Sequence, residues 1–148
     1  METNEVSGLN KQVYLEVFKI KKAVYQEMIK LCQNCLPYEA CGLLSGTQGI
    51  GMRLWEIKNE FLSPNRFYMP KESIKQAIEE MELREEQLTG IFHSHPRSPA
   101  FPSISDIKNN PYFSIAYLIV SFYKDGLEVG CFKTDGQKAI PLKLVTID

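Results

Sequence analysis

The sequence lacks an excess of charge of either sign: 17 Lys and Arg residues against 18 Asp and Glu residues leave a formal net charge of -1. Such a chain has no global positive field to attract nucleic acid or an anionic membrane. It also lacks a long apolar run. The longest, SIAYLIVSF at residues 114–122, is too short to cross a bilayer and is typical of a buried strand. We therefore expect a protein that binds neither nucleic acid nor membrane.

The start of the chain, METNEVSGLNKQ, lacks the basic and then apolar layout of a signal peptide, which favours a cytoplasmic protein. We expect residues 1–11 to be a flexible end and residues 12–148 to form one domain. Without a secretion signal, the four cysteines do not indicate disulfides. Cys32 and Cys35 form a C-x-x-C, but at the end of a predicted helix rather than at its start. Small apolar packing is therefore the favoured interpretation over redox chemistry.

Hydrophobic periodicity and turn residues predict an alternating series of strands and helices. The predicted helices cover residues 22–35, 71–88 and 103–110. The predicted strands cover residues 12–20, 41–46, 51–59, a segment from Gly90 into the histidines, 114–123, 127–133 and about 138–146. Residues 41–46 and 51–59 should pair as a hairpin, and the turns KDG and TDG should join the last three strands. This order indicates an α/β or α+β sandwich with a mixed or antiparallel sheet flanked by helices.

Histidine is scarce: the chain has two, and they alternate as His93 and His95. At the end of a strand, a period of two places both side chains on one face, close enough to bind one metal ion. Two histidines and a carboxylate form a common catalytic zinc set, and Asp106 is the nearest carboxylate downstream. Three protein ligands leave a fourth position for water. Glu39, which precedes the buried strand CGLLSG, is a candidate proton shuttle.

Each of these residues also has a simpler interpretation. Ser103 and Asp106 fit S-x-x-D, a pattern that caps helix N-termini without any catalytic role. Glu39, taken alone, would be a surface acid. The segment SPNRFYMP contains Phe67 and Tyr68, which either line a substrate groove or pack within a loop. The spacing of the two histidines alone is weak support for a metal site.

The complete pattern HSHPRSPAFPSISD is H-x-H, seven residues, S, two residues, D. It resembles the signature of the JAMM (MPN+, Mov34-type) zinc metallopeptidases, and LPYEACGLLSG resembles the segment that carries the glutamate of that family. The resemblance extends over the order of elements from about residue 12 to residue 146. It implies the MPN fold, a layered sandwich like that of cytidine deaminases.

The resemblance also implies roles. His93, His95 and Asp106 would bind Zn²⁺, Glu39 would transfer the proton of the attacking water, and Ser103 would help hold the oxyanion. Members of this family cleave amide or isopeptide bonds after the C-terminal glycine of ubiquitin-like proteins. Without long insertions near the site or a fused domain, the chain is similar to the small prokaryotic members, which are linked to sulfur-carrier proteins with a Gly-Gly tail. The sequence leaves the oligomeric state open.

Four alternatives are less well matched. A non-catalytic MPN scaffold typically loses ligands, whereas every motif position is filled here. A zinc deaminase requires H-x-E followed by P-C-x-x-C, but the C-x-x-C of this chain precedes its histidines. A DNA-repair-associated protein with a similar motif is disfavoured by the neutral charge. A metallo-β-lactamase requires aspartate two residues after the second histidine, where this chain has Arg97.

Overall fold

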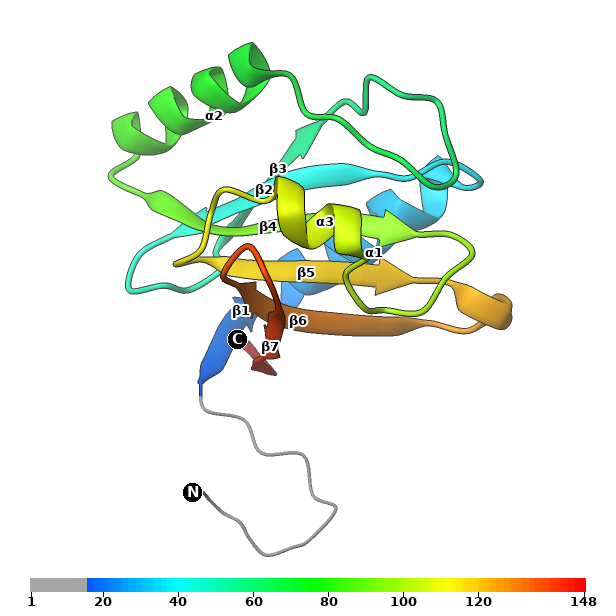
Figure 1. The fold of residues 1–148 in the computed structure, drawn as a ribbon. Coiled ribbons are helices and arrows are strands. Elements are labelled where there is room, and N and C mark those ends of the chain that lie inside the picture. The colour runs from blue at the N-terminus through cyan, green and yellow to red at the C-terminus, as the bar shows by residue number, and fades with distance from the viewer. Residues whose placement is uncertain (1–15) are drawn as a thin grey trace, which may run out of the picture.

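The structure is a computed structural model and describes residues 16–148 of the chain. Its centre is a six-stranded sheet (Figure 1). In spatial order its strands are β3 (Arg53–Ile57), β2 (Cys41–Gly46), β4 (Gln87–His95), β5 (Ala116–Ser121), β6 (Glu128–Thr134) and β7 (Ala139–Pro141). The β4–β5 pair is parallel and the other pairs are antiparallel. The prediction of a mixed sheet is therefore confirmed.

Helices cover both faces of this sheet. Consecutive residues of its central strands point to opposite sides, so each face presents apolar side chains that a helix can cover. Phe92 and Leu118 pack in the core cluster that contains residues of α1 (Lys22–Cys35). Their neighbours Ile91 and Tyr117 belong to the cluster beneath α2 (Lys71–Leu83). The two clusters lie on opposite faces of the sheet, which agrees with the predicted sandwich of a sheet flanked by helices.

A short helix, α3 (Ile104–Asn109), connects the parallel strands β4 and β5. Figure 1 shows it crossing the face of the sheet opposite to α1. Since β4 and β5 run in the same direction, the chain must return over a face of the sheet between them. The return path brings α3 over the end of β4, where the two histidines lie.

Two of the predicted boundaries are wrong. The helix predicted to end at residue 88 ends at Leu83, and Gln87 already pairs with Gly46 in the sheet. The sequence EEMELREEQL favours helix locally, but the gain from strand pairing exceeds that preference. Residues 138–146 form two strands instead of one: β7 pairs with β6, and β8 (Lys143–Ile147) pairs in parallel with β1 (Val17–Lys21).

The first part of the predicted strand 12–20 and the predicted flexible end, residues 1–11, lie outside the described residues.

The cysteines behave as small apolar residues. Cys32, on the buried face of α1, is fully buried in the core cluster, and all four thiols are free. Burial raises the pKa of the Cys32 thiol to about 12, which opposes formation of a reactive thiolate. No helix in the described part of the chain is long and apolar enough to span a membrane.

Candidate metal centre

The two histidines lie at the C-terminal end of β4, and the residue between them faces the opposite side of the sheet. The Nε2 atoms of His93 and His95 lie 3.0 Å apart. Both side chains are buried, with 0% and 5% of their surfaces exposed. The alternation of the strand therefore places two imidazole nitrogens side by side within the protein.

Asp106 completes this group from the first turn of α3. Its Oδ2 atom lies 3.3 Å from Nε2 of His93 and 3.2 Å from Nε2 of His95. The carboxylate is held by a capping box with Ser103, whose backbone N–H donates to Oδ2 at 2.9 Å while its hydroxyl accepts from the Asp106 N–H at 3.0 Å. The S-x-x-D pattern is thus a helix cap, and the same cap orients Asp106 toward the histidines.

The spacing of these three atoms fits a metal ion. Ligand atoms about 2.0–2.1 Å from a tetrahedral zinc ion are separated by about 3.3 Å from one another. The three separations here are 3.0, 3.2 and 3.3 Å. Three mutually close lone-pair atoms in a buried position repel one another unless a cation or protons lie between them. The donor set of two imidazoles and one carboxylate is suited to a divalent transition metal with one open position.

The two imidazoles are oriented by different means. His95 donates from Nδ1 to the carbonyl oxygen of Pro99, 2.8 Å away, which leaves its Nε2 lone pair directed at the centre. Nδ1 of His93 is buried and has no hydrogen-bond partner among the described residues. Its ring is instead stacked on Phe67, with centroids 4.3 Å apart and planes at 21°, and lies beside Tyr117.

The electrostatics of the centre follow from burial and from the shared carboxylate. Burial raises the pKa of Asp106, but the imidazoles of His93 and His95, which donate hydrogen bonds to this carboxylate when they are protonated, outweigh burial and hold the pKa far below its usual range. Burial lowers the pKa of His93. For His95, burial is outweighed by the Asp106 carboxylate and the Pro99 carbonyl, and the pKa is raised. The centre thus retains an ionised carboxylate, the state that binds a cation.

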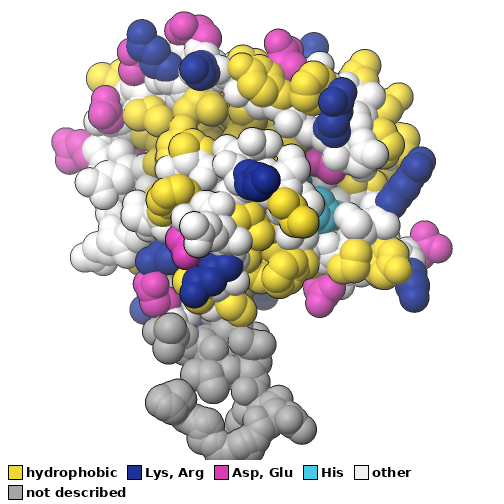
Figure 2. Space-filling model, viewed as in Figure 1, with side chains coloured by type: hydrophobic (Ala, Val, Ile, Leu, Met, Phe, Trp, Pro, Cys, Tyr) yellow, Lys and Arg dark blue, Asp and Glu magenta, His cyan; other side chains and the backbone are white. Residues whose placement is uncertain are grey.

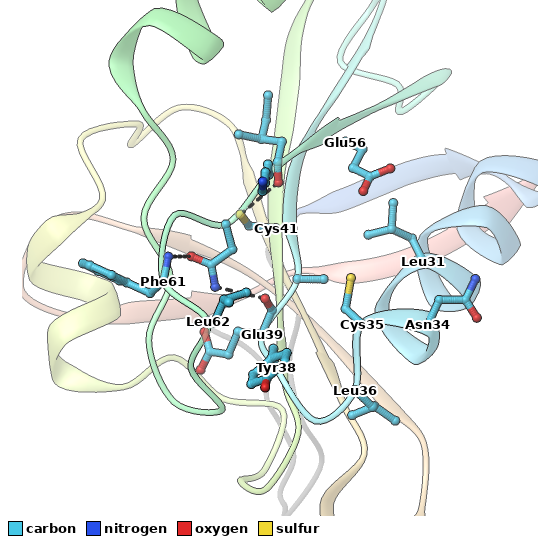
Figure 3. A pocket seen from close by; sticks show the side chains of 14 residues that line it. Leu31, Asn34, Cys35, Leu36, Tyr38, Glu39, Cys41, Glu56, Phe61 and Leu62 are labelled. Carbon is cyan, nitrogen blue, oxygen red and sulfur yellow. Dashed lines mark hydrogen bonds between the residues drawn. The ribbon is translucent and has the colours of Figure 1, made fainter.

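Glu39 is not a surface acid: its side chain is 6% exposed. It lies immediately before β2, next to β4, and it also lines a pocket of about 340 Å³ between the end of α1 and the segment after β3 (Figure 3). Burial raises the pKa of Glu39 to about 8, the His95 charge lowers it and the Asp106 charge raises it. A carboxyl group with these surroundings can take up and release a proton near neutral pH.

The structure also shows supporting residues that sequence reasoning missed. Ser94, between the histidines, accepts from the Ala40 N–H at 2.8 Å and donates its own N–H to the Ala40 carbonyl at 3.0 Å. It thereby ties the segment that carries Glu39 to the strand that carries the histidines. For Phe67 the sequence left two alternatives, a groove or loop packing; the ring packs against the cluster beneath α2 and stacks on His93. Tyr68 is 48% exposed and lies beside Phe61.

The surface around the site combines one recessed histidine with apolar side chains. Figure 2 shows a histidine side chain visible in a hollow, with hydrophobic side chains on either side of it. Phe101 and Ile104, which are close to Asp106 in the sequence, and Leu62, which lines the pocket beside Glu39, are exposed large apolar residues.

Comparison with known proteins agrees with this geometry. A family model described as prokaryotic homologs of the JAB domain matches residues 21–128 of the chain. A curated relative, the desampylase of Pyrococcus furiosus, is 35% identical over 83 residues, which are 56% of this chain and 59% of the relative. The match thus covers less than two thirds of that relative's length.

Solved structures show the same fold. A protein from Desulfitobacterium hafniense, solved in solution, is 30% identical with a TM-score of 0.72, and the alignment covers 88% of this chain and 94% of that chain. A JAB1/MPN domain protein from Archaeoglobus fulgidus is 22% identical with a TM-score of 0.58, and the alignment covers 86% of this chain and 98% of that one.

Proposed function

The chain belongs to the family of prokaryotic homologs of the JAB domain, and from this premise we propose that it is a zinc-dependent peptidase that hydrolyses the amide bond after the C-terminal glycine of a ubiquitin-like carrier protein. One observation carries the catalytic part of the proposal. Nε2 of His93, Nε2 of His95 and Oδ2 of Asp106 converge with separations close to those around a tetrahedral ion. A buried carboxyl group, Glu39, lies next to them.

The assignment of roles follows from the chemistry of each group. His93, His95 and Asp106 would hold Zn²⁺, and the ion would supply Lewis acidity to the attacking water and the scissile carbonyl. Glu39 would take the proton of the water and pass it to the leaving amine, as a general base and then a general acid. Its burial supports this role, because the pKa of about 8 keeps both protonation states accessible.

Ser103 would help to stabilise the oxyanion that forms at the scissile carbonyl. Its oxygen accepts the capping hydrogen bond from Asp106, and its hydroxyl hydrogen makes no hydrogen bond within residues 16–148. The capping role and the catalytic role therefore use different parts of one hydroxyl group. The cap also fixes the direction in which the remaining donor can point.

The substrate part of the proposal rests on two observations. The similarity to a desampylase supports a ubiquitin-like protein as substrate. The pocket beside Glu39 is bordered by Ile57 and Asn59 at the end of β3, which is an edge strand of the sheet. An extended tail can form main-chain hydrogen bonds with a free edge. We expect the metal to be reached through a narrow slot, which would admit glycines and exclude larger side chains.

The test uses a small Gly-Gly carrier with a C-terminal amino-acid or peptide extension, incubated with zinc-loaded enzyme and weighed by mass spectrometry. The expected result is loss of the mass beyond Gly-Gly, blocked by a chelator and absent with Glu39→Gln. A carrier whose last glycine is replaced by a bulky residue should resist cleavage. If every Gly-Gly adduct remains intact while short unrelated peptides are cut, the carrier part is wrong. If metal-loaded enzyme cleaves neither, a non-catalytic scaffold becomes the better explanation.

A further inference from the structure

The segment after β3 is a surface loop whose two ends are joined by the Asn59 side chain and by a backbone hydrogen bond from the Glu60 N–H to the Tyr68 carbonyl, 3.2 Å. Residues 60–68 are mostly exposed, so burial contributes little to their position. Asn59 uses its amide in four hydrogen bonds at the neck of this loop. Its Oδ1 accepts from the N–H groups of Phe61 at 3.0 Å and Tyr68 at 2.9 Å. The loop therefore resembles a compact Ω-loop with Asn59 at its closure.

The same amide reaches the segment that carries the proposed base. Nδ2 of Asn59 donates to the carbonyl oxygen of Glu39 at 3.0 Å and to that of Arg66 at 3.1 Å. These bonds use the full capacity of a side-chain amide, two donors and an acceptor oxygen with two lone pairs. The loop is also bonded directly to the base, since the Glu39 N–H donates to Ser63 at 2.8 Å. Dashed lines beside Glu39 and Phe61 in Figure 3 mark two of the Asn59 bonds.

The loop delivers a second group to the centre. Phe67 lies between Arg66 and Tyr68, two of the four residues that Asn59 binds, and its ring stacks on His93. A metal-binding histidine usually has its second nitrogen bonded to a carbonyl or carboxylate, which fixes the ring. His95 has such a bond, but Nδ1 of His93 has no partner in the part of the chain that the structure describes. Stacking by Phe67 takes the place of that bond.

We propose that Asn59 is a positioning residue that sets two parts of the centre at once: the Glu39 backbone directly, and the His93 imidazole through Phe67. Within residues 16–148 the Asn59 side chain makes its hydrogen bonds to backbone groups and makes none to His93, His95 or Asp106, so it acts through the residues that it binds. The inference rests on the proposed function where turnover is concerned. Its consequence for metal affinity does not require any substrate.

The first experiment measures the Zn²⁺ dissociation constant by competition with a chromophoric chelator. Asn59→Ala should weaken binding roughly 10-fold, the scale on which supporting groups act on a metal site. Asn65→Ala is the matched control: Asn65 lies in the same loop and bonds Ser63, but not Glu39 or the segment next to Phe67. The Asn65→Ala variant should keep the wild-type Zn²⁺ affinity and the wild-type absorption spectrum after Co²⁺ substitution, whereas Asn59→Ala should change both.

The second experiment tests the route through the aromatic ring. Phe67→Leu should weaken Zn²⁺ binding, and adding Asn59→Ala to Phe67→Leu should weaken it little further, because both changes release the same contact. Where substrate is turned over, Asn59→Ala should lower kcat more than it raises KM, because the proton-transferring carboxyl group moves. Asn59→Asp keeps an acceptor oxygen for the two backbone N–H groups, but it replaces the NH2 donor with an oxygen that repels the carbonyls of Glu39 and Arg66. It provides the same readings if Asn59→Ala does not fold.

The outcomes separate this inference from the proposed function. If a folded Asn59 variant binds Zn²⁺ as tightly as Asn65→Ala and has the same Co²⁺ spectrum, the inference is wrong even though the enzyme is active. If the effects of Asn59→Ala and Phe67→Leu on affinity simply add, the route through Phe67 is wrong. If Zn²⁺ affinity falls as expected but the wild-type protein cleaves no Gly-Gly adduct, the inference stands and the proposed function fails.

Discussion

His95 donates a hydrogen bond from Nδ1 to the carbonyl oxygen of Pro99 at a distance of 2.8 Å. A carbonyl can only accept, so the proton of the neutral imidazole is on Nδ1 and the lone pair on Nε2 faces Asp106 and His93. The proline-containing segment after β4 thus sets the tautomer of His95, a proposed metal ligand. One fixed imidazole, one stacked imidazole and one capped carboxylate provide a site that is organised before a metal arrives.

We predict that one Zn²⁺ binds per chain. Elemental analysis of protein purified without added metal, and again after dialysis against zinc, measures the stoichiometry. His93→Ala and His95→Ala should each lose the metal, because two ligands are rarely sufficient. The fold should persist in both, since the main hydrophobic cluster between α1 and the sheet contains neither histidine. Far-UV circular dichroism checks that both variants are folded. Wild-type protein that contains no zinc after dialysis against zinc would contradict the assignment.

Glu39→Gln should separate proton transfer from metal binding. Loss of a general base costs on the order of 10² to 10⁴-fold in turnover, and the amide preserves the size of the side chain. Zinc content should remain at the wild-type value. Asp106→Asn should instead weaken metal binding, since it removes the ionised oxygen that lies near both imidazoles. Release of zinc by Glu39→Gln would make Glu39 a ligand and reverse the assignment.

The burial of Glu39 predicts a pH-dependent stability of the metal-free protein. Its pKa is raised from 4.5 to about 8, so the folded state binds the proton more tightly than the unfolded state does. This contribution is fully present below the unfolded pKa and is lost as the pH rises through the folded pKa. Metal-free Glu39→Gln should therefore be more stable than the wild-type protein above pH 8, with the difference vanishing near pH 4.5. Urea denaturation with a chelator present, repeated across this range, measures it; a pH-independent difference would contradict the prediction.

Two substitutions at Ser103 should distinguish its capping role from its catalytic role. Ser103→Ala removes the cap of α3, which typically costs about 1 kcal/mol, whereas glycine at this position costs only a few tenths. Both remove the hydroxyl donor, so both should lower turnover to a similar degree, on the order of 10² to 10³-fold. Thermal denaturation and steady-state kinetics measure the two effects. If turnover instead falls in proportion to the loss of stability, so that Ser103→Gly is close to wild type, Ser103 acts only as a helix cap.

Local patterns in the sequence were sufficient for much of the fold and for bringing together the three proposed metal ligands. A period of two places His93 and His95 on one face of a strand whatever surrounds it. The S-x-x-D pattern defines the start of α3 through bonds within four residues. The turn residues similarly specify the hairpins from β5 to β7. These features depend on backbone geometry and on neighbours close in the chain, which is the information that sequence spacing contains.

Tertiary structure alone decided the features that depend on residues distant in the chain. Glu39 looks like a surface acid until the loop after β3 and strand β4 enclose it. The helix predicted through residue 88 ends at Leu83, because pairing of β4 with β2 competes successfully with local helix preference. The contact of Phe67 with His93 likewise joins positions 67 and 93 across α2. Burial and long-range pairing are set by the packing of the whole domain, so a short stretch of sequence does not encode them by itself.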